Sequence, residues 1–188
     1  ADVLIGDLRR LPGRFGLLVT AIEYRAKRFE AAQVHLNATL HCLHGAERER
    51  VLGLAPLLHP DSVPAYRQRT AAERDSICEA FWWSHDPTPT TRANERLVEH
   101  VARLVDGDFY FVPARRRRAG IETDRGEIYL RYGPPSAAKR SAEYDYPAWH
   151  WTYRNAQGPV ASFVFLDAML NGDYHRLRRG AGSDFMHP

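Results

Sequence analysis

Residues 120–135 read Gly120-Ile121-Glu122-Thr123-Asp124-Arg125-Gly126-Glu127-Ile128-Tyr129-Leu130-Arg131-Tyr132-Gly133-Pro134-Pro135 and carry the strongest structural signals in the chain. Asp124-Arg125-Gly126 has turn chemistry, because glycine reaches positive φ at no steric cost and aspartate can bond its own backbone. Ile128 to Tyr132 alternates apolar and polar residues of strand-forming types. Gly133-Pro134-Pro135 would end that strand, since proline cannot donate to a hydrogen-bonded ladder. We therefore expect turn, strand, turn across this segment.

Further strands are expected on both sides of this segment. Residues 108–112 are short and aromatic. Residues 149–153 place three aromatic side chains on one face of a strand, namely Trp149, Trp151 and Tyr153. Residues 155–158, Asn-Ala-Gln-Gly, have the composition of a hairpin turn, and residues 160–166 follow as a largely buried partner strand. This pattern predicts a small, mostly antiparallel sheet.

The first half of the chain has helical periodicity. Apolar residues recur at helical spacing from Val3 to Leu43, with a break at Pro12-Gly13. Residues 21–45 resemble one helix pair of a tetratricopeptide repeat, with small residues set between larger apolar ones. Such repeats recur at about 34 residues, and no second copy follows here. We therefore favour a single helical hairpin, and keep a peptide-binding helical module as an alternative.

Helix starts and stops can be placed in the middle of the chain. Residues 47–54 predict a short helix, and residues 59–64 are turn-rich and suit a linker. Thr70-Ala71-Ala72-Glu73 is a capping box that opens a helix ending by Asp86. We expect that helix to bury an apolar face made of Ile77, Ala80, Phe81 and Trp83.

A stiff link and one more helix precede the expected strands. Residues 86–91, Asp-Pro-Thr-Pro-Thr-Thr, predict an extended connection. The next helix has Gly107 as its expected stop and an apolar stripe made of Leu97, Val98, Val101, Leu104 and Val105. The fold class is therefore α+β. We expect a helical, repeat-like region at 1–62 and a second domain of two helices and a sheet at 63–188, with a flexible tail after about 179.

Composition limits the classes of function. The 188 residues include 44% hydrophobic and 26% charged residues, with a net charge of only +3. This charge is too small to indicate a nucleic-acid partner. The run Phe15 to Ile22 is too short to cross a bilayer, so we expect no transmembrane segment of the chain's own. Cys42 and Cys78 suit one disulfide or two thiols, and the spacing alone leaves both open. The first residue, Ala1, is compatible with a removed signal peptide, a lost initiator methionine or a sequence that starts late, and we favour the first.

Two blocks together resemble the GWxTD-domain proteins. Residues 81–90, followed by Asn94-Glu95, resemble the family's "FW…RDPTP…NE" block, and residues 120–135 resemble its "GWxTDRGxIYxxYGPP" block. Residues 146–151 resemble the aromatic strand that follows. The signature tryptophan is replaced here by Ile121. The resemblance implies structural motif positions at Asp86, Pro87, Pro89, Gly120, Thr123, Asp124, Arg125, Gly126, Gly133 and Pro134.

The resemblance also implies a setting. Members of the family are bacterial, usually directed to the cell envelope, and have no established catalytic activity or cofactor. We therefore expect a non-enzymatic accessory or scaffold subunit, without a cofactor, that binds other proteins in a larger membrane-associated assembly. The expected location is the periplasm, peripheral to a membrane.

An enzyme is the alternative hypothesis. An envelope hydrolase or carbohydrate-binding protein would need carboxylates to converge near Asp124, with candidates at Asp86, Glu95, Glu122, Asp124 and Glu127. We favour turn and capping roles for Asp86 and Asp124, and a turn hydroxyl at Thr123. The pairs His41/His44 and His85/His150 lack a metal-binding motif, so no metal is expected.

The candidate interface residues are basic or aromatic. The run Arg115, Arg116, Arg117 and Arg118 fits either a dock for anionic lipid headgroups or an acidic partner, or a solvated loop, and both interpretations stay open. Aromatic residues and arginine are favoured at protein interfaces. We accordingly predict an interface at Trp82, Trp83, Tyr144 and Tyr146, and assign Tyr129, Trp149 and Trp151 to the core of the sheet.

Overall fold

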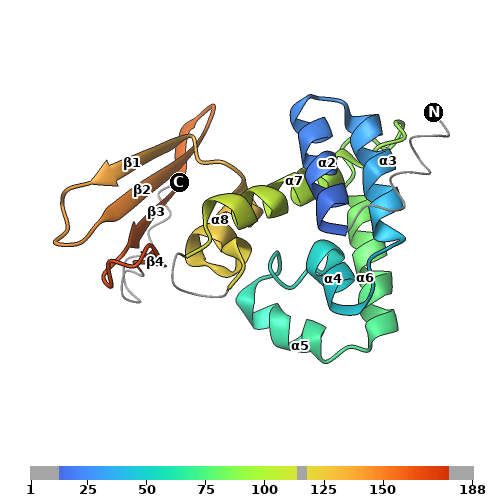
Figure 1. The fold of residues 1–188 in the computed structure, drawn as a ribbon, viewed down its shortest axis with the longest axis horizontal. Helices are drawn as coiled ribbons and strands as arrows, with labels where there is room; N and C mark the ends of the chain where they lie inside the picture. Colours follow the sequence, from blue (N-terminus) through green and yellow to red (C-terminus); the bar gives the residue numbers. More distant parts are fainter. Residues whose placement is uncertain (1–12, 114–117, 178–188) are drawn as a thin grey trace. The chain divides into compact units, whose positions relative to one another are not determined.

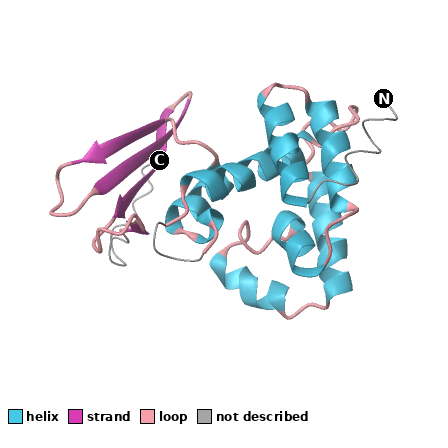
Figure 2. Ribbon diagram, in the orientation of Figure 1, coloured by secondary structure: helices cyan, strands magenta, loops and turns pink. Residues whose placement is uncertain are grey.

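The computed structural model describes residues 13–113 and 118–177, without the side chain of Arg14. Within these residues the chain forms seven α-helices and a four-stranded antiparallel sheet, which confirms the α+β class (Figures 1 and 2). It divides into two compact units, residues 1–106 and 107–188. The expected boundary at residue 62 lies inside the first unit. The expected helical residues before 13 and the tail after 179 lie outside the described residues.

The first unit is helical. Its elements, in chain order, are α2 (Gly13–Arg25), α3 (Phe29–Leu40), α4 (Gly45–Leu52), the 3-10 turn η1 (Pro60–Ser62), α5 (Val63–Arg67), α6 (Ala71–Ser84) and the beginning of α7 (Glu95–Tyr110). Helices α2 and α3 lie side by side as a helical hairpin (Figure 1). The hairpin spans 13–40, earlier in the chain than the helix pair expected at 21–45, which contains α3 and only the end of α2. They approach closely at Gly16, where a Cβ atom would stand 2.1 Å from Oγ1 of Thr39.

One apolar core fills this unit. Its buried side chains come from all six helices of the unit and from the loops on both sides of α4, and include Ala21, Leu36, Val51, Leu54, Trp82, Val98 and Val101. All five residues of the predicted α7 stripe are buried, which confirms that periodicity. The expected linker at 59–64 is instead η1 and the start of α5, where Pro60 and Pro64 occupy first-turn positions that need no backbone donor.

The phase of α6 differs from the prediction, although its start is confirmed. Thr70 and Glu73 form the reciprocal capping box. The residues that α6 buries are Cys78 and Trp82, whereas Trp83 is 79% exposed and Ile77 is 39% exposed. The helix has apolar residues on two faces, so periodicity alone could not decide which face the core would take. The segment after it is also not extended, because Thr91 N–H donates to the Thr88 carbonyl in a turn (2.9 Å).

The second unit places one helix against the sheet. It contains the end of α7, the 3-10 turn η2 (Gly120–Glu122), α8 (Asp124–Tyr132), β1 (Ala137–Ser141), β2 (Ala148–Asn155), β3 (Gly158–Leu166) and β4 (His175–Arg176). The strand order is β1-β2-β3-β4, and all neighbours are antiparallel. The β2–β3 turn is the expected one, with the Asn155 carboxamide oxygen accepting from the N–H groups of Gln157 and Gly158.

Aromatic side chains form the core of this unit. Trp151 pairs with Phe163 across β2 and β3, and Trp149 pairs with Phe165. The buried cluster is Phe111, Ile128, Tyr129, Trp151, Tyr153 and Phe165. The prediction that alternate aromatic residues of β2 face the core is therefore confirmed. Strand β3 alternates instead of being largely buried, since Phe165 alone among its residues is fully covered.

Two predicted strands are helices. Residues 128–132 belong to α8, because Thr123 caps its start and Gly133, with φ of 78°, ends it. These paired end signals outweigh a strand propensity that covers only five residues. Residues 108–110 continue α7 beyond Gly107, so Gly107 is not a stop. A Cβ atom there would meet the Ile121 side chain at 2.7 Å, and the glycine therefore serves close packing.

Candidate functional site

The motif at 120–133 is held together by Thr123. Its hydroxyl donates to the Gly120 carbonyl (2.7 Å) and accepts from the Gly126 N–H (3.1 Å). The threonine is 2% exposed, so no water competes for either bond. The side chain thereby joins η2 to the first turn of α8. Both capacities of the hydroxyl are used inside the fold, which excludes Thr123 as an accessible nucleophile.

Two glycines of the motif sit where backbone touches backbone. A Cβ atom on Gly126 would stand 2.0 Å from the Gly120 carbonyl oxygen, and one on Gly120 would stand 2.0 Å from that of Gly107. Neither obstacle is a movable side chain. The glycines therefore let α7, η2 and α8 approach more closely than any other residue would allow.

Asp124 and Arg125 do not pair with each other. Asp124 accepts the Arg176 N–H through Oδ2 (2.7 Å), which ties α8 to β4. The Arg125 guanidinium lies 4.3 Å from the centre of the Tyr174 ring and 5.2 Å from that of Phe111. Burial lowers the pKa of Arg125. Both side chains thus attach α8 to the C-terminal part of the sheet.

Sequence reasoning missed two buried aspartates near β4. Asp167 is 4% exposed and Asp173 is 2% exposed. Asp167 accepts the N–H groups of Asn171 (3.0 Å) and Gly172 (2.8 Å). Asp173 binds Arg118 (3.1 Å), the last residue of the arginine run, so Arg118 faces inward rather than toward a partner. Arg115, Arg116 and Arg117 lie outside the described residues.

The motif residues of the first unit also organise the backbone. Asp86 accepts the Thr88 N–H (3.0 Å), which confirms its bracing role beside Pro87 and Pro89. Asn94 accepts the Leu97 N–H (2.9 Å) at the start of α7 and donates to the Trp82 carbonyl at hydrogen-bond distance. These residues set where α6 ends and α7 begins.

The candidate carboxylates have separate partners. In the second unit Glu122 accepts the Ala119 N–H (3.2 Å), Glu127 pairs with Arg131 (3.3 Å), and Asp124 holds Arg176. Asp86 and Glu95 belong to the first unit. Glu122, Asp124 and Glu127 are therefore each engaged by a different group of the second unit.

The candidate histidine and cysteine side chains have individual contacts within the fold. No group of three or more metal-ligating side chains is found among residues 13–113 and 118–177. His85 stacks on Phe81 with ring centres 4.1 Å apart, and His150 bonds Ser162. Cys42 is exposed, whereas Cys78 is buried beside the Tyr66 hydroxyl (3.3 Å), and the two are not joined by a disulfide. Burial raises the pKa of Cys78, which disfavours a reactive thiolate there.

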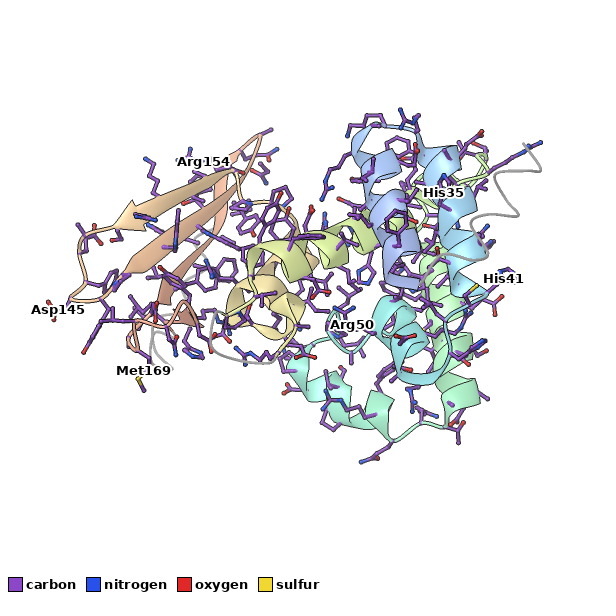
Figure 3. All side chains as sticks on the ribbon, viewed as in Figure 1. His35, His41, Arg50, Asp145, Arg154 and Met169 are labelled. Atoms are coloured by element: carbon purple, nitrogen blue, oxygen red, sulfur yellow. The ribbon has the colours of Figure 1, made fainter. Side chains whose placement is uncertain are left out.

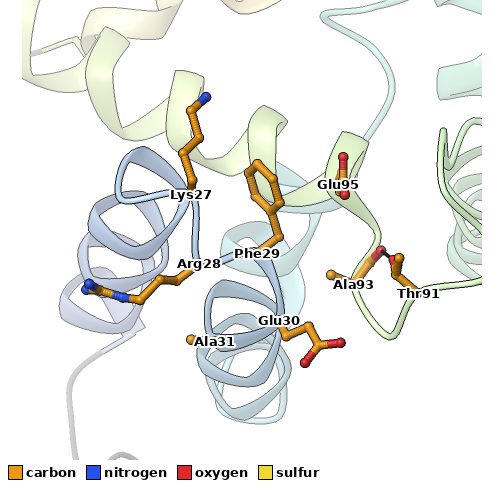
Figure 4. A pocket seen from close by; sticks show the side chains of 8 residues that line it. All are labelled: Lys27, Arg28, Phe29, Glu30, Ala31, Thr91, Ala93 and Glu95. Carbon is orange, nitrogen blue, oxygen red and sulfur yellow. Dashed lines mark hydrogen bonds between the residues drawn. The ribbon is translucent and has the colours of Figure 1, made fainter.

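The first unit also has an open depression of about 350 Å³. Figure 4 shows its lining, which comes from the start of α3 and the segment before α7: Lys27, Arg28, Phe29, Glu30, Ala31, Thr91, Ala93 and Glu95. Both signs of charge are present, and Arg28 is already paired with Glu23. The depression contains neither a nucleophile beside a base nor a buried polar group aimed into it.

The predicted aromatic interface residues separate into two groups. Trp82 is 4% exposed, and its indole N–H donates to the Leu52 carbonyl (2.9 Å), so its assignment to an interface was wrong. Trp83 is 79% exposed. In the loop between β1 and β2, Tyr144 is half-buried and Tyr146 is 47% exposed.

The exposed side of α6 is the strongest candidate site of the first unit. Ile77, Ala80 and Trp83 recur at helical spacing on one side of the helix, and we call them the α6 outer face. Ser76 and Ser84 lie beside them and are exposed, uncharged side chains. The exposed glutamate Glu79 lies one turn before Trp83 at the edge of this face. A large exposed tryptophan is a residue type favoured at protein-binding sites.

Comparison with family models, curated proteins and solved structures found no match to this chain.

Proposed function

We propose that this chain is a non-enzymatic accessory subunit that binds another protein through the α6 outer face. The observation that carries the proposal is Trp83, whose side chain projects from a well-capped helix with 79% of its surface exposed. A tryptophan provides a large contact area at small entropic cost, and such residues dominate binding energy at interfaces.

The neighbours of Trp83 support the proposal. Trp82, on the other side of the helix, is fixed in the core by its bond to Leu52. The capping box fixes the start of the helix. The α6 outer face is therefore held in one orientation before a partner arrives, which reduces the ordering entropy that binding must overcome.

The setting of the subunit is part of the same proposal. The resemblance to GWxTD-domain proteins supports a bacterial, envelope-directed assembly at a membrane, with the protein held peripherally. No helix in the described part of the chain is long and apolar enough to cross a bilayer. A partner subunit would then provide the attachment to the membrane.

The test is to isolate the tagged full chain from its host's membranes in mild detergent. Three forms are compared: the natural chain, the double variant Ile77→Ser/Trp83→Ser, and a matched control, Ile22→Ser/Val34→Ser. Ile22 and Val34 are 48% and 49% exposed on α2 and α3 of the same unit. We expect a salt-resistant partner in fixed stoichiometry with the natural chain and the control, and its loss with the α6 variant. A chain that is isolated alone, or a partner that both variants retain equally, would contradict the proposal.

A further inference from the structure

The loop between β3 and β4, residues 167–174, is built around a buried carboxylate. Asp167 accepts the N–H groups of Asn171 and Gly172, one with each oxygen, and its backbone carbonyl accepts the Leu170 N–H (3.3 Å). Three donors from the far side of the loop therefore converge on one residue that is 4% exposed. The loop is closed on itself and has a defined shape.

A second set of contacts fixes the base of this loop. Arg125 of α8 donates to the Gly172 carbonyl (3.4 Å) while its guanidinium stacks on Tyr174. Arg118 binds Asp173, and the Asn171 side chain accepts the Asp173 N–H (2.9 Å). The β3–β4 loop is thus attached to α8 through Arg125 and to the segment before η2 through Arg118.

The tip of this loop presents two apolar side chains to solvent. Met169 is 76% exposed and Leu170 is 69% exposed, and Figure 3 shows Met169 projecting outward. Leu170 also has φ of 53°, a left-handed conformation that is unfavourable for leucine. Asparagine or glycine would suit this backbone and water better. The leucine therefore costs the folded chain conformational energy and recovers little of it by burial.

We propose that the tip formed by Met169 and Leu170 is a second contact point, which inserts into an apolar pocket of a partner protein. The proposal rests on the proposed binding function and adds a surface in the other unit. A strained residue that the surrounding contacts hold in place is a common feature of binding loops. Methionine adapts its shape to an irregular pocket, and a loop that is ordered in advance loses little entropy on binding.

Among the residues that the structure describes, the charges that contact this loop favour a protein pocket over a bilayer. Asp167 and Asp173 are buried beneath it, and the arginines that contact the loop, Arg118 and Arg125, donate inward to Asp173 and Gly172. Insertion of two apolar side chains into a membrane is weak unless cations also face anionic headgroups. A protein pocket needs apolar complementarity alone.

The first part of the test uses Leu170→Asn in the full chain, with Val160→Ser as a control on an exposed β3 residue of the same unit. Asparagine tolerates the left-handed conformation and removes the apolar side chain. We expect Leu170→Asn to leave the urea midpoint unchanged or to raise it. A lowered midpoint would show that Leu170 serves the stability of the fold, and would overturn the proposal.

The second part places the photo-crosslinker p-benzoylphenylalanine at Ala168, an exposed residue beside the tip, in the host cell. We expect a crosslink to one protein, reduced about tenfold by Leu170→Asn and unchanged by Val160→Ser. Crosslinks to lipid or to a second copy of this chain would overturn the proposal. An intact complex without a crosslink would overturn it and leave the α6 proposal standing, whereas the absence of any complex would reject both.

Discussion

The buried side chain of His100 makes the free energy of unfolding of the first unit depend on pH. Its ring is 4% exposed on α7, with its centre 4.8 Å from that of Trp82. Burial, with Arg96 and Arg103 nearby, lowers its pKa from 6.5 to about 3, against a smaller opposing effect of a hydrogen bond with the Val51 backbone. The imidazole is therefore neutral in the folded protein throughout the physiological range.

The direction of the effect follows from this difference. Below pH 6.5 the unfolded chain binds a proton at His100 and the folded chain does not, so the free energy of unfolding falls as the pH falls. With each pKa unit worth about 1.4 kcal/mol, the loss between pH 7 and pH 5 is about 2 kcal/mol. The loss continues down to the folded-state pKa near 3.

The assay is urea unfolding at a series of pH values from 7.5 to 5.0, with the natural chain, His100→Gln and His44→Gln. Glutamine does not titrate, so the slope of stability against pH should largely disappear in His100→Gln even if its absolute stability is lower. His44 is exposed, and its replacement should leave the slope unchanged. Equal slopes in all three proteins, or a flat profile for the natural chain, would refute the assignment.

Three further predictions concern folding, each measured by urea unfolding. Gly126→Ala should destabilise by about 3 kcal/mol or more because its Cβ meets a backbone oxygen, whereas Gly107→Ala meets a side-chain methyl and should lose clearly less; equal losses would contradict this. Thr123→Ala should lower the free energy of unfolding by about 1–2 kcal/mol, and Thr123→Ser, which keeps the hydroxyl, should lose much less; equal losses in the two variants would contradict the role of the hydroxyl. Trp82→Phe should cost about 1–3 kcal/mol by leaving the Leu52 carbonyl unpaired, and Trp83→Phe under about 0.5 kcal/mol; the reverse order would invert our assignment of the two faces.

Features with a local cause were predictable from sequence. The Thr70–Glu73 capping box and the 155–158 hairpin turn each depend on hydrogen bonds within a few residues, and both are found in the structure. The sheet face of β2 was also readable, since strand alternation has a period of two and leaves no choice of phase once the aromatic side chains are buried.

The α8 segment shows how local signals can conflict. Ile128 to Tyr132 has strand propensity, but Thr123 at one end and Gly133 at the other are helix boundaries. The turn expected at Asp124-Arg125-Gly126 is instead the first turn of the helix. An N-cap threonine before the segment and a glycine after it are the sequence signals that indicate a helix at α8.

Other features depend on distant partners and leave no local signal. Arg118 and Asp173 are far apart in the sequence, yet they form an ion pair in which the aspartate is buried. The choice between Trp82 and Trp83 was equally hidden, because it is decided by the Leu52 carbonyl and the packing of α7 against α6. The candidate binding surfaces differ in the same way. Trp83 was predicted from its residue type, whereas the β3–β4 loop was not predicted, because its shape depends on contacts with α8.

The most direct test of the binding account is hydroxyl-radical labelling of the tryptophans in the free protein and in the complex isolated from its host. Trp82 and Trp83 are adjacent, so the buried Trp82 is an internal control for the exposed Trp83. We predict strong labelling of Trp83 in the free protein and a fall to the level of Trp82 in the complex. Equal labelling of Trp83 in both states would contradict the claim that the α6 outer face binds the partner.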